Sequence, residues 1–404
     1  MVEMNRTHQK QEYIRIKSIM KRFHQLMTGG ALIASITLAA TGCSMMEEDR
    51  SDCPTGLYVR FVYDYNTQRA DMFKDHVGYV NVYVYDEDGN KVAERSVANT
   101  YGSAPLSMYG YAMHFGTNEL PTGRRYRLQA IAMQRQWDET LHTPGAKYRR
   151  TEVNDTASLR ITLDHASTAI PGSQAGELYP VDNTAPLDTL WHTLKVTALD
   201  PTYGRQSPSL AATEKPYSIY PVEEQMVTVN EGYATYATLS LIRDTKHLNL
   251  TLFQTDNPSE MDANDYEVGI VDDNATLTSD NSVEPGDSLL YTPYAQWTSS
   301  PNTTEAMGHY NIMFNRIMYP TADNTSAQLY IRHKSTGKTV VKIDLARYLA
   351  ECRISPLWNY SPQEYLDREY DYELNFFLQG DKWKYCSIVI HAMPWSVRKQ
   401  NEEL

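Results

Sequence analysis

Hydrophobic and polar residues alternate along much of the chain, which is the pattern of strands that turn one face toward a core. Leu57–Phe61 (LYVRF) places a leucine, a valine and a phenylalanine on one face. Tyr79–Tyr85 (YVNVYVY) places three valines on one face and three tyrosines with an asparagine on the other. Asp88-Gly89 follows the second segment and predicts a turn. Both segments are therefore expected to be strands.

The same alternation returns throughout the rest of the chain. Six further strands are expected at Leu159–His165, Leu248–Phe253, Gln328–His333, Thr339–Leu345, Tyr372–Gly380 and Tyr385–His391. Gly337-Lys338 lies between two of them and predicts a second turn. Helical periodicity is scarce, and Asp344–Arg353 (DLARYLAECR) is the best short candidate, for one or two turns.

Many short strands with polar turns and few helices indicate an all-β protein built from two tandem antiparallel β-sandwich domains with long loops. The polar, turn-rich segment Thr255–Asp265 is the expected boundary between them. We predict a signal region at 1–42, a tether at 43–56, an N-terminal domain at 57–256 and a C-terminal domain at 257–404. Tyr outnumbers Phe 30 to 8, which suits half-exposed sheet faces.

The N-terminal region carries the signs of a secretory signal. Leu26–Gly42 is apolar but only about 17 residues long, shorter than the roughly 20 residues of a spanning helix. Lys21-Arg22 supplies a basic start and Ala39–Gly42 supplies small residues before a cleavage site. Because Met20 directly precedes the basic pair, translation is expected to begin there.

The end of the apolar run, Ala40-Thr41-Gly42-Cys43, resembles a bacterial lipobox, although Ala40 replaces the usual leucine. The resemblance implies cleavage between Gly42 and Cys43 and acylation of Cys43, with palmitate among its acyl chains. Plain signal cleavage with an incidental Cys43 is the alternative. Two or three acyl chains would hold the protein in a membrane almost irreversibly, because each buried methylene adds roughly 0.8 kcal/mol. The acidic cluster Glu47–Asp49 is either a solvated tether or, by resemblance, a surface-export signal of Bacteroidota lipoproteins.

Charge and cysteine content narrow the function classes. Residues 1–42 hold six Lys/Arg and two Asp/Glu, so their removal would change the net charge from −13 to about −17. Such an acidic chain is not expected to bind nucleic acid. The four cysteines form no C-x-x-C pair, which disfavours a zinc site. Cys352 and Cys386 could form a disulfide, but a buried free thiol at Cys386 is at least as consistent with the pattern.

Motifs of catalysis and cofactor binding are weak, so no enzyme, metal site or cofactor is expected. Asp86–Asn90 (DEDGN) superficially resembles a calcium loop, but a hairpin turn explains it better because the ligand spacing fails. Asp367, Glu369, Asp371 and Glu373 recur at every second position and would share a strand face. Paired carboxylates could serve glycoside hydrolysis, but a solvated acidic edge strand is favoured.

Seven segments together resemble the fimbrial anchor lipoproteins of Bacteroidota, the fimbrillin-associated anchor subunits of type V pili, over roughly residues 43–398. They are Ser51–Tyr63, Val77–Val92, Leu239–Leu252 with a buried-looking Arg243, Phe314–Tyr319, Val340–Leu349, Ser361–Leu378 and Ile388–Arg398. The resemblance implies two transthyretin-like sandwiches. It also implies a pilus anchor that is lipid-linked to the outer membrane, is surface-exposed within the fimbrium, holds the shaft subunit (fimbrillin) and limits filament length.

Subunits of this kind assemble by strand exchange, in which a segment of one subunit fills an open sheet edge of the next. Ala392-Met393-Pro394 precedes Trp395, and the proline is expected to interrupt ladder pairing. The tail Ser396–Leu404 is short, polar and not alternating, which makes it a poor donor strand. We therefore expect this subunit to receive a strand, or to dock by a loop, rather than to donate its C-terminus.

One other class of function remains open at this level. A surface lipoprotein could bind glycans or host proteins on exposed aromatic residues, for which the candidates are Trp137, Trp191, Trp297 and Trp358. Aromatic residues can equally pack beneath loops. The discriminating observation is therefore which of these side chains reach the surface.

Overall fold

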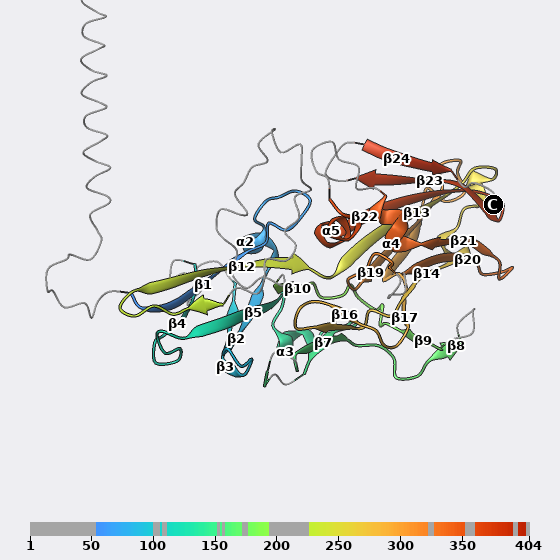
Figure 1. Ribbon diagram of the computed structural model, residues 1–404. Coiled ribbons are helices and arrows are strands. Elements are labelled where there is room, and N and C mark those ends of the chain that lie inside the picture. Colours follow the sequence, from blue (N-terminus) through green and yellow to red (C-terminus); the bar gives the residue numbers. More distant parts are fainter. Residues whose placement is uncertain are drawn as a thin grey trace, which may run out of the picture. The chain divides into compact units, whose positions relative to one another are not determined.

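The computed structural model (Figure 1) describes residues 54–400 except 100–105, 107–110, 152–153, 156–157, 172–176, 194–225, 322–326, 352–359 and 391–394. Gly42, Cys43 and the expected signal, cleavage site and tether up to residue 53 lie outside the described residues, as do Cys352 and Trp358. The described chain is mostly β-strand, so the all-β class is confirmed.

The first sheet is built from the N-terminal half of the chain. Its strand order is β3-β2-β5-β10-β12-β1-β4, and β11 also pairs with β5. The strands are β1 (Gly56–Val62), β2 (Tyr79–Tyr85), β3 (Lys91–Ala98), β4 (Met113–Phe115), β5 (Arg125–Met133), β10 (Leu190–Thr193), β11 (Val227–Thr228) and β12 (Ala234–Arg243). Helix α2 (Phe73–His76) contributes Phe73 to the core of this sheet.

Strands β1 and β2 confirm the two segments expected from alternation. Leu57, Val59 and Phe61 are all buried in one core cluster. The tyrosine face of β2 differs from expectation, because Tyr83 and Tyr85 are fully buried instead of half-exposed. They belong to a second, larger core cluster. Both faces of β2 are therefore covered, each by a different core.

Three further sheets surround the larger core. The second sheet has the order β18-β19-β13-β22-β23-β24, the third β21-β20-β14-β17-β9-β8 and the fourth β16-β15-β7-β6. The second comprises β13 (Lys246–Gln254), β18 (Ala295–Ser299), β19 (Met307–Phe314), β22 (Asp371–Gln379), β23 (Lys382–Ile390) and β24 (Trp395–Gln400). The third comprises β8 (Ile170–Pro171), β9 (Glu177–Pro180), β14 (Tyr266–Asp272), β17 (Leu289–Tyr291), β20 (Gln328–His333) and β21 (Thr339–Asp344). The fourth comprises β6 (Tyr148–Arg150), β7 (Arg160–Leu163), β15 (Thr276–Thr278) and β16 (Val283–Glu284).

Short helices complete the described structure: α3 (Trp137–Thr140), α4 (Leu345–Ala350), α5 (Pro362–Arg368), and the 3₁₀ turns η2 (Pro258–Glu260) and η3 (Ala263–Asp265). Helix α4 confirms the helix expected after Asp344. The Asp344 carboxylate caps it by accepting a hydrogen bond from the Arg347 backbone N–H at 3.0 Å. Both expected turns are present, and Gly89 and Gly337 adopt the positive φ values of 84° and 68° that favour glycine.

Three described strand pairs are parallel, which the expectation of antiparallel sheets did not include. They are β1 with β12, β13 with β22, and β17 with β9. Each pair joins segments far apart in sequence, as a parallel pair requires a long connection. Alternation along one strand reports which face is buried and carries no information about the direction of the partner.

Strands from both sides of residue 256 pair with one another. β13 precedes this position and pairs with β19 and β22. β7 and β9 also precede it, and they pair with β15 and β17. Thr55–Leu404 forms one compact unit. The division into domains at 57–256 and 257–404 stays a prediction, as does the transthyretin-like detail.

Candidate functional site: a buried polar junction

A charged segment lies fully buried where β12 ends and β13 begins. Asp244, Thr245 and Lys246 each have 0 % of their surface exposed. Figure 1 shows β12 running on into β13, so this segment links the first sheet to the second. A buried charge is tolerated only with close partners. The polar residues that supply those partners, together with Asp244–Lys246, are here called the junction.

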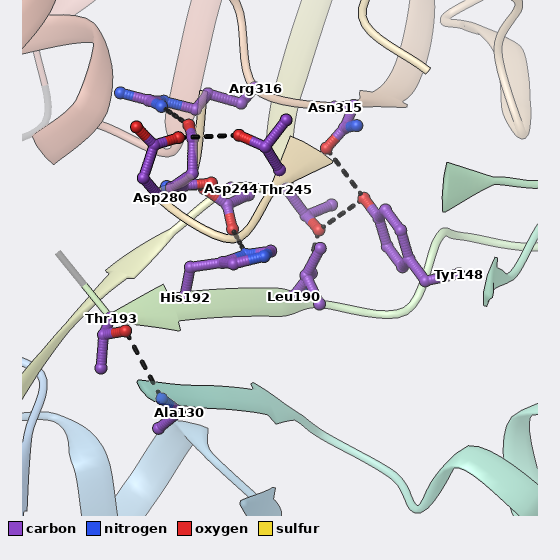
Figure 2. Close-up of polar contacts among 12 residues, drawn as sticks. Ala130, Tyr148, Leu190, His192, Thr193, Asp244, Thr245, Asp280, Asn315 and Arg316 are labelled. Carbon is purple, nitrogen blue, oxygen red and sulfur yellow. Dashed lines mark hydrogen bonds and ion pairs between the residues drawn. The ribbon is translucent and has the colours of Figure 1, made fainter. Parts of the chain in front are cut away.

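Asp244 is held from two sides (Figure 2). Its Oδ2 lies 2.6 Å from His192 Nδ1, and His192 comes from β10 of the first sheet. Its Oδ1 accepts a hydrogen bond of 2.7 Å from Asn281 Nδ2, in the turn between β15 and β16. The carboxylate of Asp244 therefore ties the first sheet to the fourth.

Asp367 of α5 is the second buried acid of the junction. Its two carboxylate oxygens accept hydrogen bonds from Arg316 Nε and Nη2 at 2.8 and 2.7 Å, a paired geometry with high directional specificity. Arg316 Nη1 also donates to the backbone oxygen of Asn281. Burial alone would raise the pKa of Asp367, but the positive charges of Arg316 and Lys246 outweigh it and lower that pKa.

Lys246 reaches the end of α5 from the first position of β13. Its Nζ donates to the backbone oxygens of Asp367 and Glu369, both at 2.9 Å. Burial lowers the pKa of Lys246 to about 8, against the opposing pull of the nearby Asp367 and Asp244 carboxylates. The lysine thus satisfies carbonyls at the helix end that the helix itself leaves without partners.

Thr245 binds the opposite side of the junction (Figure 2). Its hydroxyl accepts a hydrogen bond of 3.0 Å from the Leu190 backbone N–H and donates to the Asp188 carbonyl at 3.2 Å. Tyr148 Oη lies 3.0 Å from Thr245 Oγ1 and donates to Asn315 Oδ1 at 3.3 Å. Thr245 therefore connects β10 with Tyr148 of β6, and Tyr148 extends the network to the segment after β19.

Arg243 and Arg368 add aromatic contacts beside the junction. The Arg243 guanidinium lies 4.2 Å from the ring centre of Tyr370, and its Nε donates to the Thr245 carbonyl at 3.0 Å. Burial lowers the pKa of Arg243. The Arg368 guanidinium lies 3.9 Å from the Tyr65 ring and pairs with Glu364 at 2.9 Å. These cation–π contacts are strongest when desolvated, so both arginines stiffen the same region.

The prediction that Asp367, Glu369, Asp371 and Glu373 share an acidic edge strand is wrong. Asp367 lies in α5 and not in a strand, and Glu369 is buried with 4 % of its surface exposed. Asp371 and Glu373 do lie in β22, but this strand pairs with β13 on one side and β23 on the other, so it is no edge. The two-residue spacing was misleading because α5 ends at Arg368, within the pattern.

The remaining residues singled out in the sequence, namely the Asp86–Asn90 loop, the described tryptophans and Cys386, do not lie in the junction. Asp86–Asn90 is a hairpin turn, with the Asp86 carboxylate accepting a hydrogen bond of 2.8 Å from the Asn90 N–H. Trp191 is fully buried and Trp137 is partly buried against the larger core. Trp297 has 46 % of its surface exposed. Cys386 is a buried free thiol, and burial raises its pKa to about 12.

The junction connects the sheets through side chains that are buried, including its histidine and its carboxylates. His192 and Asp244 form a close pair with 0 % exposure on both side chains. Among the described residues, no group of three or more His, Cys, Asp or Glu side chains is arranged to hold a metal ion. In the same part of the chain, no helix has the length and apolar character to cross a membrane.

Most residues of the junction were not predicted from the sequence. The run Arg243–His247 (RDTKH) interrupts two strongly alternating strands with five consecutive polar residues. That interruption was a usable signal, since a polar run between core strands needs buried partners or a surface turn. Its partners His192, Asn281 and Arg316 carry no signal of their own, as they are isolated polar residues in separate segments.

The match to a protein family decides what kind of protein carries this junction. The model for the fimbrillin-A associated anchor proteins Mfa1 and Mfa2 matches residues 50–401. The chain belongs to this family. The family identification confirms the resemblance seen in the sequence, and it associates the protein with fimbriae. A search of curated protein sequences gave no significant match.

Solved structures share the fold over almost their whole length. A candidate polysaccharide-binding protein from Bacteroides thetaiotaomicron is 26% identical, with a TM-score of 0.60 over 86% of this chain and 99% of that chain. A candidate adhesin from the same organism is 23% identical, with a TM-score of 0.63 over 87% and 100%. The fimbrial anchor protein Mfa2 from Porphyromonas gingivalis is 15% identical, with a TM-score of 0.50 over 86% and 100%.

Proposed function

We propose that this protein is an outer-membrane lipoprotein that anchors the base of a fimbria to the cell surface and limits filament length. The match to the anchor family over residues 50–401 carries the proposal. The lipobox-like Ala40–Cys43 ends seven residues before the matched region begins, and an acylated Cys43 would become the first residue of the mature protein. The acidic cluster Glu47–Asp49 would direct the lipoprotein to the outer surface.

The lipid and the protein body would be joined by a short tether. Residues 43–56 can span at most about 45 Å when fully extended. This reach is comparable with the thickness of a bilayer including its headgroups, roughly 40–45 Å. The first sheet would therefore stay close to the membrane surface, and the fimbria would start there.

The fold provides a continuous route for a pulling force from the lipid to the second sheet. The tether enters β1, and β1 pairs in parallel with β12 over Gly56–Val62. A pull along β1 would load its hydrogen bonds with β12 together, since the force runs along the strands. β12 leads through the junction into β13, which pairs with β19 and β22. Under this proposal the junction prevents the first sheet from pulling away from the rest.

The position of the C-terminal strand favours a subunit that receives a strand from the shaft subunit over one that donates its own C-terminus. β24 (Trp395–Gln400) pairs antiparallel with β23 from Tyr385↔Gln400 to Ile390↔Trp395. β24 begins directly after Pro394 as a separate strand that runs back along β23, so Trp395–Gln400 is part of the second sheet. A segment already used in its own sheet is a poor donor. The shaft subunit would supply a strand or dock against a loop.

Deletion of the gene tests the function as a whole. We expect cells to shed fimbriae into the medium and the shed filaments to be longer than those of the parent strain. Electron microscopy of the medium and immunoblotting of the shaft subunit measure both effects. Unchanged length and cell attachment in the deletion strain would contradict the anchor function.

A further inference from the structure

The outer face of the second sheet is open and chemically unusual. On β13, the leucines at 248, 250 and 252 point into the core, and the intervening residues stay partly exposed. β19 and β22 show the same alternation of buried and partly exposed positions. The outer face is defined here by Asn249, Thr251, Phe253, Trp297, His309, Asp371, Glu373, Asn375, Phe377 and Tyr385.

Aromatic rings form two groups on this face. Trp297 of β18 stacks on His309 of β19, with ring centres 4.9 Å apart and planes inclined by 18°. β18 is an edge strand of this sheet, so among the described residues no strand lies on the other side of Trp297, which is 46 % exposed. Phe253, Phe377 and Tyr385 form a second stack, with centres 4.5 and 4.3 Å apart.

The distance between Trp297 and the second aromatic stack suits an extended sugar chain. Trp297 pairs with His309, and His309 pairs with Thr251, two positions before Phe253. Trp297 and Phe253 are therefore two strands apart across the sheet and two residues apart along it, which separates their Cα atoms by roughly 12 Å. This separation is comparable with the repeat of an extended disaccharide. One sugar ring could rest on Trp297 while the chain continues toward the second stack.

Neutral hydrogen-bonding side chains lie between the aromatic groups. Thr251, Asn375 and Ser387 share one cross-strand row with Trp297 and His309. Asn375 Nδ2 donates to Glu373 Oε1 at 3.2 Å, and Asn249 Nδ2 donates to Asp371 Oδ1 at 3.1 Å. Each amide group carries two N–H donors and a carbonyl acceptor, so further capacity remains for hydroxyl groups. These contacts also fix the amides in place before a ligand binds.

The histidines and carboxylates of the face select against anions. Burial lowers the pKa of His309, which keeps it neutral near pH 7. His247 Nδ1 lies 2.8 Å from Asp371 Oδ1, and Tyr294 Oη lies 3.2 Å from His247 Nε2. Asp371 and Glu373 make the outward side of β22 negative, and the described outward residues of β13, β19 and β22 include no Lys or Arg. The exposed Lys382 and Lys384 lie on β23, beyond the second stack. An acidic polymer would therefore be repelled where it crosses Asp371 and Glu373.

We propose that the outer face of the second sheet binds a neutral polysaccharide chain, with a pyranose ring stacked on Trp297. The carbon-bound hydrogens of a pyranose form an apolar face that packs on an aromatic ring, and its hydroxyls match the amides and hydroxyls of the central row. A protein partner would be expected to need a larger continuous apolar patch, whereas this face alternates rings with polar groups. The binding is independent of the anchor function, because it involves neither Cys43 nor the junction.

Affinity gel electrophoresis of the detergent-solubilised full-length protein tests the proposal. The probes are three neutral polysaccharides, glucomannan, xyloglucan and mixed-linkage β-glucan, with polygalacturonate as the acidic comparison. We expect retardation by at least one neutral polysaccharide and none by polygalacturonate. Trp297→Ala should weaken the neutral interaction at least tenfold, and Asn375→Ala should weaken it several-fold.

Tyr236→Ala is the matched control, because Tyr236 is an exposed ring (56 %) on the first sheet. It should bind like the parent protein, and thermal unfolding should show that all three variants are folded. Three results would overturn the proposal: no retardation by any neutral probe, equal retardation of the Trp297→Ala and parent proteins, or stronger retardation by polygalacturonate. Fimbrial attachment is measured separately, so this outcome does not depend on the anchor function.

Discussion

At the scale of single residues, the buried charges of the junction decide how firmly the sheets hold together. Arg316 and Asp367 form a buried pair of opposite charges there, with 10 % and 1 % of their side chains exposed. A pair of this kind adds little net free energy compared with apolar residues, but removal of one partner leaves the other charge buried and unpaired. The junction is therefore sensitive to single substitutions in a way that surface ion pairs are not.

Arg316→Met should lower the free energy of unfolding by roughly 3–5 kcal/mol, because the Asp367 carboxylate would stay buried without the guanidinium that binds both of its oxygens. Arg149→Met is the control, since Arg149 forms a solvent-exposed pair with Asp164 and such pairs contribute at most about 1 kcal/mol. Urea denaturation measures both. Similar losses for the two variants would show that the buried pair does not hold the junction.

Asp272 should make stability depend on pH. Burial raises its pKa from 3.8 to about 8 in the folded protein, so the folded state binds more protons than the unfolded state between these values. Stability therefore falls as the pH rises from about 4 to 8. Asp272→Asn cannot ionise, and its advantage over the parent protein should grow from pH 5 to pH 8. Urea denaturation at both values measures the difference, and an advantage that does not change with pH would contradict the expectation.

At the scale of secondary-structure elements, alternation predicted the strands well because each buried strand repeats its pattern within a few residues. β1, β7, β13, β20 and β22 all lie where alternation places them. The failures have local causes. The helix α5 is only seven residues long and ends inside an alternating acidic run, and the buried tyrosines of β2 face a core formed by residues far away in sequence. Neither fact can be obtained from periodicity within one segment.

The pairing of β24 with β23 predicts that the C-terminal strand can be locked without loss of anchoring. Ser387 and Arg398 are register partners in these two strands, and paired positions in adjacent antiparallel strands have Cα separations of about 4.5–5.5 Å, compatible with a disulfide. A Ser387→Cys/Arg398→Cys double variant, oxidised on cells, should retain its fimbriae. Each single-cysteine variant is a control for the substitutions alone. Release of fimbriae only from the oxidised double variant would show that β24 must leave its sheet to engage the shaft.

At the scale of the whole molecule, sequence reasoning reached the all-β class and the anchor family but not the junction. The family could be recognised because its motifs follow one another in order along the chain. The junction could not, since His192, Asp244, Asn281, Arg316 and Asp367 meet only after strands from both halves have paired. We propose that a lipid holds residue 43, that β1 passes the load to its partner β12, and that β12 leads through the junction into β13 of the second sheet.

The most direct test of this account is the substitution Cys43→Ala in the chromosomal gene, with Cys53→Ala as the matched control. Cell-bound and released fimbriae are quantified by immunoblotting after sedimentation, together with the protein itself. We predict that Cys43→Ala releases both the folded protein and the fimbriae into the medium, whereas Cys53→Ala retains both on the cells. Fimbriae that remain on Cys43→Ala cells in normal amount and length would contradict the central claim that lipidated Cys43 anchors the fimbria.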